Sequence, residues 1–452
     1  MDFLAAFIEK TNNSKNITKS ACVIIFVIIS FMMGSYYIKN VSPLTIPDAS
    51  MHLENSVALA EGNVFLTKNY IKLPSQYSFD YETADSKHPL PEFTRADRLI
   101  SYILPELYTK GGDKWLSKIK KLPKVTGQTN TYVRRQYPSI NWLPQAIGFS
   151  IAQSGNASVA NTFISMRVAN LIFYILMAVL SVCLLPRGKL IGTVLLLNPY
   201  TILLASSISG DVFTIAAASL FIAFLFNLCS PGEAIGRIKT GILFFLGILL
   251  FFTKVAYVPL LLLIFALPKE RLVLRKKFVY TGLIGGIGTS LYLIWSRFFS
   301  TVGYPINFKP DKNLAYILKR PGDAIISIFN NVIQPKDVIK YWNKIFSGKV
   351  KVINQQLLYP VIICFVIGII WLLIYLFFLR NRANWKLFLF AVLAAFASLF
   401  ITNAALLATW TFTYKFGFKD LLGFQGRYYI PLILLLLVPW VAHYGREGDD
   451  YD

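Results

Sequence analysis

Residues 240–268 read "TGILFFLGILLFFTKVAYVPLLLLIFALP" and decide how many times the chain crosses a membrane. The stretch forms either one long helix or two short helices that meet near Lys254. Its flanking loops, "SPGEAIGRIK" (230–239) and "KERLVLRKK" (269–277), both contain several basic residues. Because Lys and Arg concentrate in cytoplasmic loops, a single span would put the second loop on the wrong side. We therefore expect a hairpin with Lys254 at its outer end.

The whole chain has the composition of a membrane protein. Of its 452 residues, 55% are hydrophobic and only 15% are charged. A soluble protein of this length cannot bury so much apolar surface, so the expected solvent is the bilayer. Runs of about 20 apolar residues mark the spans. Besides the hairpin, the predicted spans are 21–38, 168–185, 190–204, 212–228, 278–298, 357–379, 387–409 and 429–444.

These runs predict an all-α integral membrane protein with about ten transmembrane helices. Both termini are then cytoplasmic, and the short loops "PRGK" and "RNRANWK" fall on the same side as the two basic loops above. Residues 1–452 are expected to form a single polytopic domain.

Two polar regions are too long to be turns, and both are expected on the extracytoplasmic side. They cover residues 39–160 and residues 301–354. In the larger one, "TRADRLISYILPELY" and "WLSKIKKL" have helical apolar spacing with basic neighbours, which is typical of helices on a membrane surface. The stretch "WLPQAIGFSIAQ" is apolar but too short to span, so it either re-enters or lies flat.

Charge and motifs argue against several function classes. The formal net charge of +22 fits basic cytoplasmic loops and anionic lipid headgroups, and without a nucleic-acid-binding signature we expect no nucleic-acid partner. The four cysteines lie in or beside apolar runs, so neither a disulfide framework nor a zinc site is expected. There is no Walker loop and no His-Glu-x-x-His pair, which argues against an ATP-driven pump and a zinc protease. No metal and no cofactor is expected.

Several polar side chains fall at the outer ends of predicted spans. Asp211 begins one span, Lys254 lies at the hairpin apex, and "GFQGRYY" places Gln425, Arg427 and Tyr428 before the last span. Ionisable groups near membrane depth are enriched in functional sites, and a guanidinium binds phosphate in a bidentate way. Each also has an ordinary explanation. Asp211 would cap a helix, Lys254 would reach for water, and Arg427 would anchor the interface among tyrosines.

Three ionisable residues follow the first span in "IPDASMHLEN", namely Asp48, His52 and Glu54. The pattern predicts a helix that begins after Asp48, with Asp48 as its N-cap. His52 then lies one turn on, on the same face. An N-cap carboxylate at a helix tip is also placed to accept a proton from an acceptor hydroxyl. Glu54 has no assigned role.

Five phrases resemble a multispanning bacterial family, the domain of unknown function 2142. "IPDASMHLENSVALAEGNVF" is similar to its Pro-Asp-Glu-x-x-His segment, with Ala49 in place of the second acid. The other four follow in the family's order and are "YPSINWLPQAIG", "LLNPYTILLASSISGD", "FTKVAYVPLLLLIFALP" and "GFQGRYYIPLILLLL". The resemblance covers nearly the whole chain.

That family in turn resembles the class C glycosyltransferases, which take a sugar from a polyprenyl-phosphate carrier at the outer membrane face. The resemblance implies an acidic catalytic base soon after the first span, where Asp48 lies. It also implies surface helices in the first outer loop and a basic residue near the lipid phosphate, for which Arg427 and Lys254 are candidates. A shared fold does not by itself establish a shared activity.

The sequence thus predicts a hexosyltransferase of the bacterial inner membrane with an extracytoplasmic active site. Its substrates would be undecaprenyl-phosphate-linked hexose, such as glucose, and a surface polysaccharide such as O-antigen. Asp48 would be catalytic, and the substrate-binding candidates are His52, Trp142, Gln145, Asp211, Lys254, Gln425, Arg427 and Tyr428. Among these candidates, His52 would hydrogen-bond the acceptor and Trp142 would stack on the sugar. Membrane lipids are the other expected partners. The alternatives are a transporter or flippase of lipid-linked glycans, and a non-catalytic assembly or receptor subunit.

Overall fold

The structure, a computed structural model, describes most of the predicted spans. The described residues are 15–43, 46, 48–67, 70–74, 115–116, 128–230, 232–301, 309–333, 385–409, 413–418 and 426–442. The predicted span 357–379, the candidate Gln425 and the predicted surface helix 94–108 lie outside them. Of the predicted surface helix 115–122, only residues 115–116 are described.

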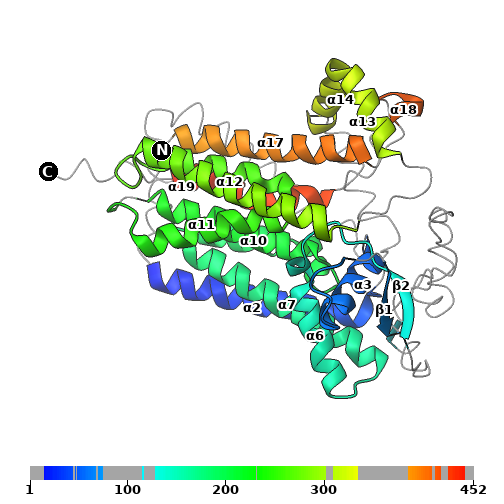
Figure 1. The fold of residues 1–452 in the computed structure, drawn as a ribbon. Helices are drawn as coiled ribbons and strands as arrows, with labels where there is room; N and C mark the ends of the chain where they lie inside the picture. Colours follow the sequence, from blue (N-terminus) through cyan, green and yellow to red (C-terminus); the bar gives the residue numbers. More distant parts are fainter. Residues whose placement is uncertain are drawn as a thin grey trace.

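Five of the described helices are long and apolar enough to cross a membrane. The first, α2, runs over Lys15–Asn40, and its apolar part is Ser20–Asn40. The other four are α7 (Val159–Leu184), α10 (Asp211–Leu228), α12 (Leu274–Phe299) and α17 (Trp385–Thr409). Figure 1 shows these helices side by side in one bundle. The prediction of an all-α, multi-pass membrane protein is confirmed, whereas the total of ten spans stays a prediction.

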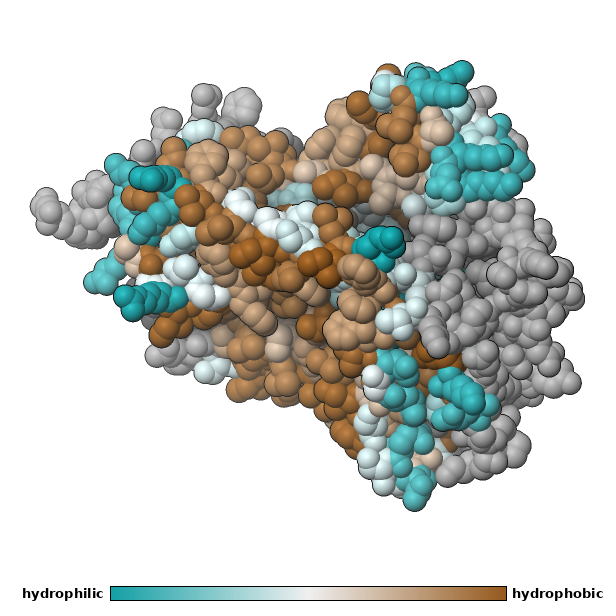
Figure 2. All heavy atoms as spheres, in the orientation of Figure 1, coloured by the Kyte–Doolittle hydropathy of each residue, from teal (hydrophilic) through white to brown (hydrophobic). Residues whose placement is uncertain are grey.

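Helix α10 forms the centre of the bundle. Nearly all of its residues are buried, and it contacts α7, α11 (Arg237–Phe252) and the last apolar segment. The outer helices α2 and α12 instead expose large apolar side chains such as Phe31, Met32 and Phe278. Figure 2 shows this surface as a broad brown band, with teal residues gathered at its two ends. Such a band is the surface expected to contact lipid.

The stretch 240–268 is a helical hairpin, as the loop charges predict. Helix α11 ends at Phe252, and the 3₁₀ segment η4 (Val255–Ala266) follows directly after Lys254. The two pack together closely, because a Cβ added at Gly247 would lie 3.2 Å from the Leu261 side chain. The basic loops meet at the far end, where Arg271 donates to the carbonyls of Ser230 and Glu233.

One predicted span is wrong as a continuous helix. Residues 190–204 form two short helices, α8 (Lys189–Leu196) and α9 (Pro199–Ala205). Pro199 has no N–H to donate, and the Asn198 side chain accepts from the N–H groups of Tyr200 and Thr201. This is an N-cap followed by Pro at the first helical position, which starts a new helix inside an apolar run.

The last apolar segment is also divided. It consists of the 3₁₀ segment η7 (Gly426–Leu437), which contains Pro431, and the short helix α19 (Val438–Ala442). A 3₁₀ segment of this length is unusual, and Pro inside it removes a backbone donor. Its second residue is Arg427, so η7, like η4, has a basic side chain beside its start.

The smaller elements gather around the other end of the bundle from α19 (Figure 1). They include a two-stranded antiparallel sheet that sequence patterns did not predict, in which Tyr70 pairs with Tyr132 and Pro74 with Gln128. The short apolar stretch predicted to lie flat or re-enter forms α6 (Leu143–Ser154), which packs on α7. These elements are α3 (Ala49–Ala60), β1 (Tyr70–Pro74), β2 (Gln128–Tyr132), η3 (Ser139–Trp142), α6 (Leu143–Ser154), α13 (Pro310–Lys319), α14 (Pro321–Ile333) and α18 (Thr413–Phe416).

Candidate functional site

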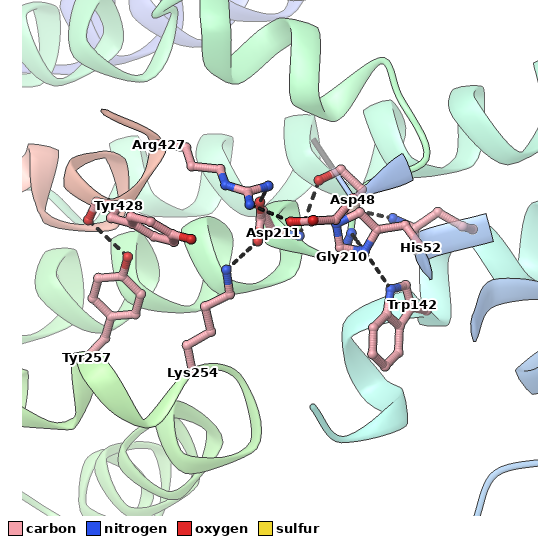
Figure 3. A network of polar contacts seen from close by, with 11 residues as sticks. Asp48, His52, Trp142, Gly210, Asp211, Lys254, Tyr257, Arg427 and Tyr428 are labelled. Carbon is pink, nitrogen blue, oxygen red and sulfur yellow. Dashed lines mark hydrogen bonds and ion pairs between the residues drawn. The ribbon is translucent and has the colours of Figure 1, made fainter. Parts of the chain in front are cut away.

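Four ionisable side chains from distant parts of the chain meet at one end of the bundle. Asp48 precedes α3, Asp211 begins α10, Lys254 separates α11 from η4, and Arg427 lies at the start of η7. Figure 3 shows all four in one network of ion pairs. The sequence places each of them at a helix end, and the fold brings those ends together.

Asp211 is the centre of this network. Its Oδ1 accepts from Lys254 Nζ at 2.5 Å, and its Oδ2 accepts from Arg427 Nη1 at 2.8 Å. The side chains of Asp211 and Arg427 are only 8% and 4% exposed. Asp211 therefore makes no side-chain cap of its helix, and Lys254 is held by the carboxylate instead of reaching for water. A nearly buried charge needs such partners to remain charged.

Asp48 lies at the more open edge of the network. Its Oδ2 accepts from Arg427 Nη2 at 2.5 Å, and its side chain is 47% exposed. The residue stands at the N-cap position of α3, but its side chain caps nothing. Its φ of 60° is in the left-handed region, where Asp is one of the more tolerated residues. Such conformations recur at functional sites.

The charge of Asp48 is stabilised by its neighbour. Partial removal from water would by itself raise the pKa of this carboxyl, but the Arg427 guanidinium beside it holds the pKa below its usual range. Asp48 is therefore an ionised carboxylate at neutral pH. It is able to accept a proton, and it will do so more readily when Arg427 is engaged elsewhere.

Aromatic rings enclose the basic side chains. Lys254 Nζ lies 5.2 Å from the ring centre of Tyr137 and 5.3 Å from that of Tyr428. The Tyr257 hydroxyl donates to the Tyr428 carbonyl at 2.9 Å, which fixes the start of η7 against η4. These cation–π contacts hold the ammonium group in place without neutralising it. Sequence patterns missed Tyr137 and Tyr257, which lie beside the site only in the folded chain.

His52 and Trp142 form a second, neutral part of the site. The Trp142 indole N–H donates to His52 Nδ1 at 2.9 Å, and the Gly210 backbone N–H also donates to that nitrogen at 3.3 Å (Figure 3). Trp142 is fully buried. Sugar stacking, which was expected for Trp142, does not fit this burial, because the ring presents no open face. Its contact with His52 is the interaction that the structure contains.

Polar side chains hydrogen-bond the loop that directly precedes Asp211. Gln145 donates to the Ser209 carbonyl at 2.8 Å, and Asn170 donates to the Ser207 carbonyl at 2.8 Å. Gln145 also donates to the Asn170 side-chain oxygen and is fully buried. Gln145 therefore stabilises the loop before Asp211 and is not exposed to a ligand. Sequence reasoning missed Asn170, although an amide within an apolar run is a usable signal.

Arg167 is the main support beneath this layer. Its Nε donates to the Ser206 carbonyl at 2.5 Å, and its Nη atoms donate to the carbonyls of Tyr37, Ile38 and Val41 at the end of α2. The side chain is fully buried, and its guanidinium also lies 5.3 Å from the ring centre of Trp115. Helix C-termini carry partial negative charge, so these carbonyls compensate the cation. This residue was also missed from sequence, although it precedes a predicted span directly.

Six of the nine sequence-predicted site residues meet in this region. They are Asp48, His52, Asp211, Lys254, Arg427 and Tyr428. Trp142 and Gln145 lie behind them, and Gln425 lies outside the described residues. Within the described part of the chain, no group of three or more His, Cys, Asp or Glu side chains could hold a metal ion. The absence of a metal and of a cofactor in the working protein stays a prediction.

Fold and site define an all-α, multi-pass membrane protein with a charged network where broken helices meet. The chain belongs to the family described as "Predicted membrane protein (DUF2142)", which matches residues 31–436. The family resemblance expected from the five phrases is thereby confirmed. No curated protein and no solved structure matches the chain. The likeness to class C glycosyltransferases stays a prediction.

Proposed function

We propose that this protein is a membrane glycosyltransferase that moves a hexose from a polyprenyl-phosphate carrier to a hydroxyl of a surface glycan. One observation carries the proposal. A half-exposed carboxylate, Asp48, shares a single site with two nearly buried cations, Arg427 and Lys254. A base for the acceptor and a cationic pocket for a phosphate leaving group are the two functions that such a transfer needs.

In the proposed reaction Asp48 is the general base. An acceptor hydroxyl attacks the anomeric carbon, its proton passes to the Asp48 carboxylate, and the bond from that carbon to the phosphate oxygen breaks. The configuration at the anomeric carbon is inverted by this single displacement. The polyprenyl phosphate leaves with both electrons of the broken bond, and Asp48 afterwards releases its proton to water.

Arg427 and Lys254 would hold the phosphate. Both are already paired with carboxylates, so an incoming phosphate competes with Asp48 and Asp211 for them. A guanidinium engaged by phosphate stabilises the Asp48 charge less, and the basicity of Asp48 then rises. Binding of the lipid-linked sugar would thus raise the basicity of Asp48 before the acceptor is deprotonated. The buried surroundings of Arg427 strengthen its attraction for the developing charge.

The remaining features of the proposal follow from the predicted topology. The site would face the extracytoplasmic side of the bacterial inner membrane, where an undecaprenyl-linked hexose such as glucose and an O-antigen-like acceptor are presented. The broad apolar surface of the bundle in Figure 2 supports a lipid-linked donor, because the carrier chain must remain in the bilayer while its phosphate reaches the site.

The test supplies the membrane-embedded protein with polyprenyl-phosphoryl hexose and an acceptor glycan, and it measures new glycosidic bonds. Wild-type protein is expected to transfer the sugar, and Asp48→Asn to lose transfer while keeping its fold. Glu61→Gln is the matched control, since Glu61 is an exposed carboxylate at the other end of α3. Unchanged transfer by Asp48→Asn removes Asp48 from the catalytic role.

A flippase of lipid-linked glycans is the second candidate, and the broken helices favour it. Both η4 and η7 contain Pro, and a basic residue lies at the start of each: Lys254 directly precedes η4, and Arg427 is the second residue of η7. Discontinuous helices with charged ends are a feature of carriers, whose sites lie near the membrane midplane. Here the charges lie at helix ends, at one end of the bundle. Movement of a lipid-linked sugar from one leaflet of a vesicle membrane to the other, without any new glycosidic bond, would favour this candidate.

A further inference from the structure

The two hydrogen bonds to His52 fix the position of its ring proton. Trp142 Nε1 and the Gly210 backbone nitrogen are donors only, and both donate to Nδ1. Nδ1 must therefore present a lone pair, which leaves the proton of the neutral ring on Nε2. The tautomer of a histidine is set in this way by the partner of its other nitrogen.

The surroundings also keep the ring neutral. Burial lowers the pKa of His52 to about 4, although Asp211 and Asp48 act in the opposite direction. The other charged groups that act on the ring are Arg427 and Lys254, which favour the neutral form. A proton added to Nδ1 would also face two N–H donors. At neutral pH the ring is thus a hydrogen-bond donor through Nε2, and it is not a base.

Close packing holds the ring in this state. A Cβ added at Gly210 would lie 2.8 Å from Trp142 Nε1, so only glycine allows the indole to reach His52. His52 is 2% exposed, and its backbone N–H donates to the Asp48 carbonyl one turn earlier. Figure 3 shows the ring between α3 and the ion-pair network.

The protonated nitrogen has no partner among the described residues. Nε2 is buried and makes no hydrogen bond. Leaving a buried N–H unpaired is unfavourable, so a nitrogen held this firmly is expected to meet an acceptor atom when the site is filled. That acceptor must be an atom that offers a lone pair.

We infer that His52 Nε2–H binds the oxygen of the acceptor hydroxyl and thereby selects hydroxyl over amine acceptors. This inference rests on the proposed function. A hydroxyl oxygen has two lone pairs, so one accepts from His52 while the other attacks the sugar, and its proton goes to Asp48. A neutral amine has a single lone pair, which cannot accept from His52 and attack at the same time. His52 is thus the residue that determines the acceptor class.

The test compares a hydroxyl acceptor with its amine analogue at a pH where the amine is unprotonated. His52→Met removes the donor at similar length, and it is expected to lower transfer to the hydroxyl about tenfold, with little change for the amine. His52→Gln keeps a side-chain N–H and is expected to restore most of the preference for the hydroxyl. Binding of polyprenyl phosphate alone by each variant serves as the control for folding.

A second measurement needs no substitution. Nitrogen NMR of histidine-labelled protein is expected to show one ring protonated at Nε2, with no titration between pH 5.5 and 8, whose signal moves when the acceptor is added. A ring protonated at Nδ1, or one that titrates near its ordinary value, overturns the inference. So does an active wild type whose hydroxyl-to-amine ratio is unchanged in His52→Met. A wild type that transfers no sugar overturns the proposed function and this inference with it.

Discussion

The ion pair between Asp48 and Arg427 predicts that loss of the proposed base strengthens binding of the lipid phosphate. In the free site Asp48 occupies one guanidinium nitrogen, at 2.5 Å. Asp48→Asn removes that competing charge and leaves Arg427 for the ligand. Because the Asp48 side chain is 47% exposed, water screens the pair, and exposed pairs contribute about 0.2–1 kcal/mol. The expected gain is therefore about 1.4- to 5-fold in affinity.

The assay measures binding of polyprenyl phosphate to purified protein in detergent, for wild type, Asp48→Asn and the control Glu61→Gln. Asp48→Asn should bind more tightly while it transfers no sugar, and the gain should shrink as salt is added, because mobile ions screen exposed charges. Glu61→Gln should match the wild type. Equal or weaker binding by Asp48→Asn would refute the competition between carboxylate and phosphate, whatever its effect on transfer.

Three other substitutions test buried ionisable groups in and near the site. Asp211→Asn leaves the nearly buried Lys254 without a carboxylate, while Arg427 keeps Asp48. The change should lower stability by about 3–5 kcal/mol, most of which a second change, Lys254→Met, restores. Arg167→Met removes the side-chain donor of four backbone carbonyls and should cost about 3–5 kcal/mol, whereas exposed Arg237→Met should be neutral. Burial raises the pKa of Glu54 from 4.5 to about 8, so wild-type stability should fall between those pH values by up to about 1.4 kcal/mol per unit, and Glu54→Gln should abolish the decline.

Unfolding of purified protein in detergent, followed by tryptophan fluorescence, measures all three effects. Stability falls as the pH rises because the folded protein keeps a proton on Glu54 that the unfolded chain releases between those two pH values. A wild-type stability that rises between pH 4.5 and 8 contradicts the raised pKa of Glu54. An Asp211→Asn variant as stable as the wild type contradicts the central role of that carboxylate.

Hydropathy and loop charge suffice to predict the five long apolar helices that the structure describes, and the hairpin. Apolar runs report burial in lipid directly, and the basic loops on both sides of residues 240–268 leave only the hairpin consistent with positive charge inside. The break within residues 190–204 is different, because the run remains apolar through it. The break is indicated by Asn198 and Pro199, which are an N-cap residue and a favoured first helical residue. These two residues hardly change the mean hydropathy of the run, so hydropathy alone does not detect the break.

The site could be predicted as a set of residues but not as a set of contacts. Topology places Asp48, Asp211 and Arg427 near one level of the membrane, and nothing in the sequence says which carboxylate pairs with which cation. The burial of Trp142 was equally hidden, since an aromatic residue in a loop suits both a binding face and a core. Only tertiary packing against His52 and Gly210 separates the two.

Arg167 has a consequence for the order in which the chain is made. Three carbonyls at the end of α2 accept a hydrogen bond from Arg167, which lies 126–130 positions further along the chain. At about 5–20 residues per second, a ribosome needs roughly 6–26 s to supply it. During that interval the end of α2 lacks these side-chain hydrogen bonds. Packing of α7 then supplies these hydrogen bonds, so the support beneath the loop before Asp211 is completed only after α7 has been inserted.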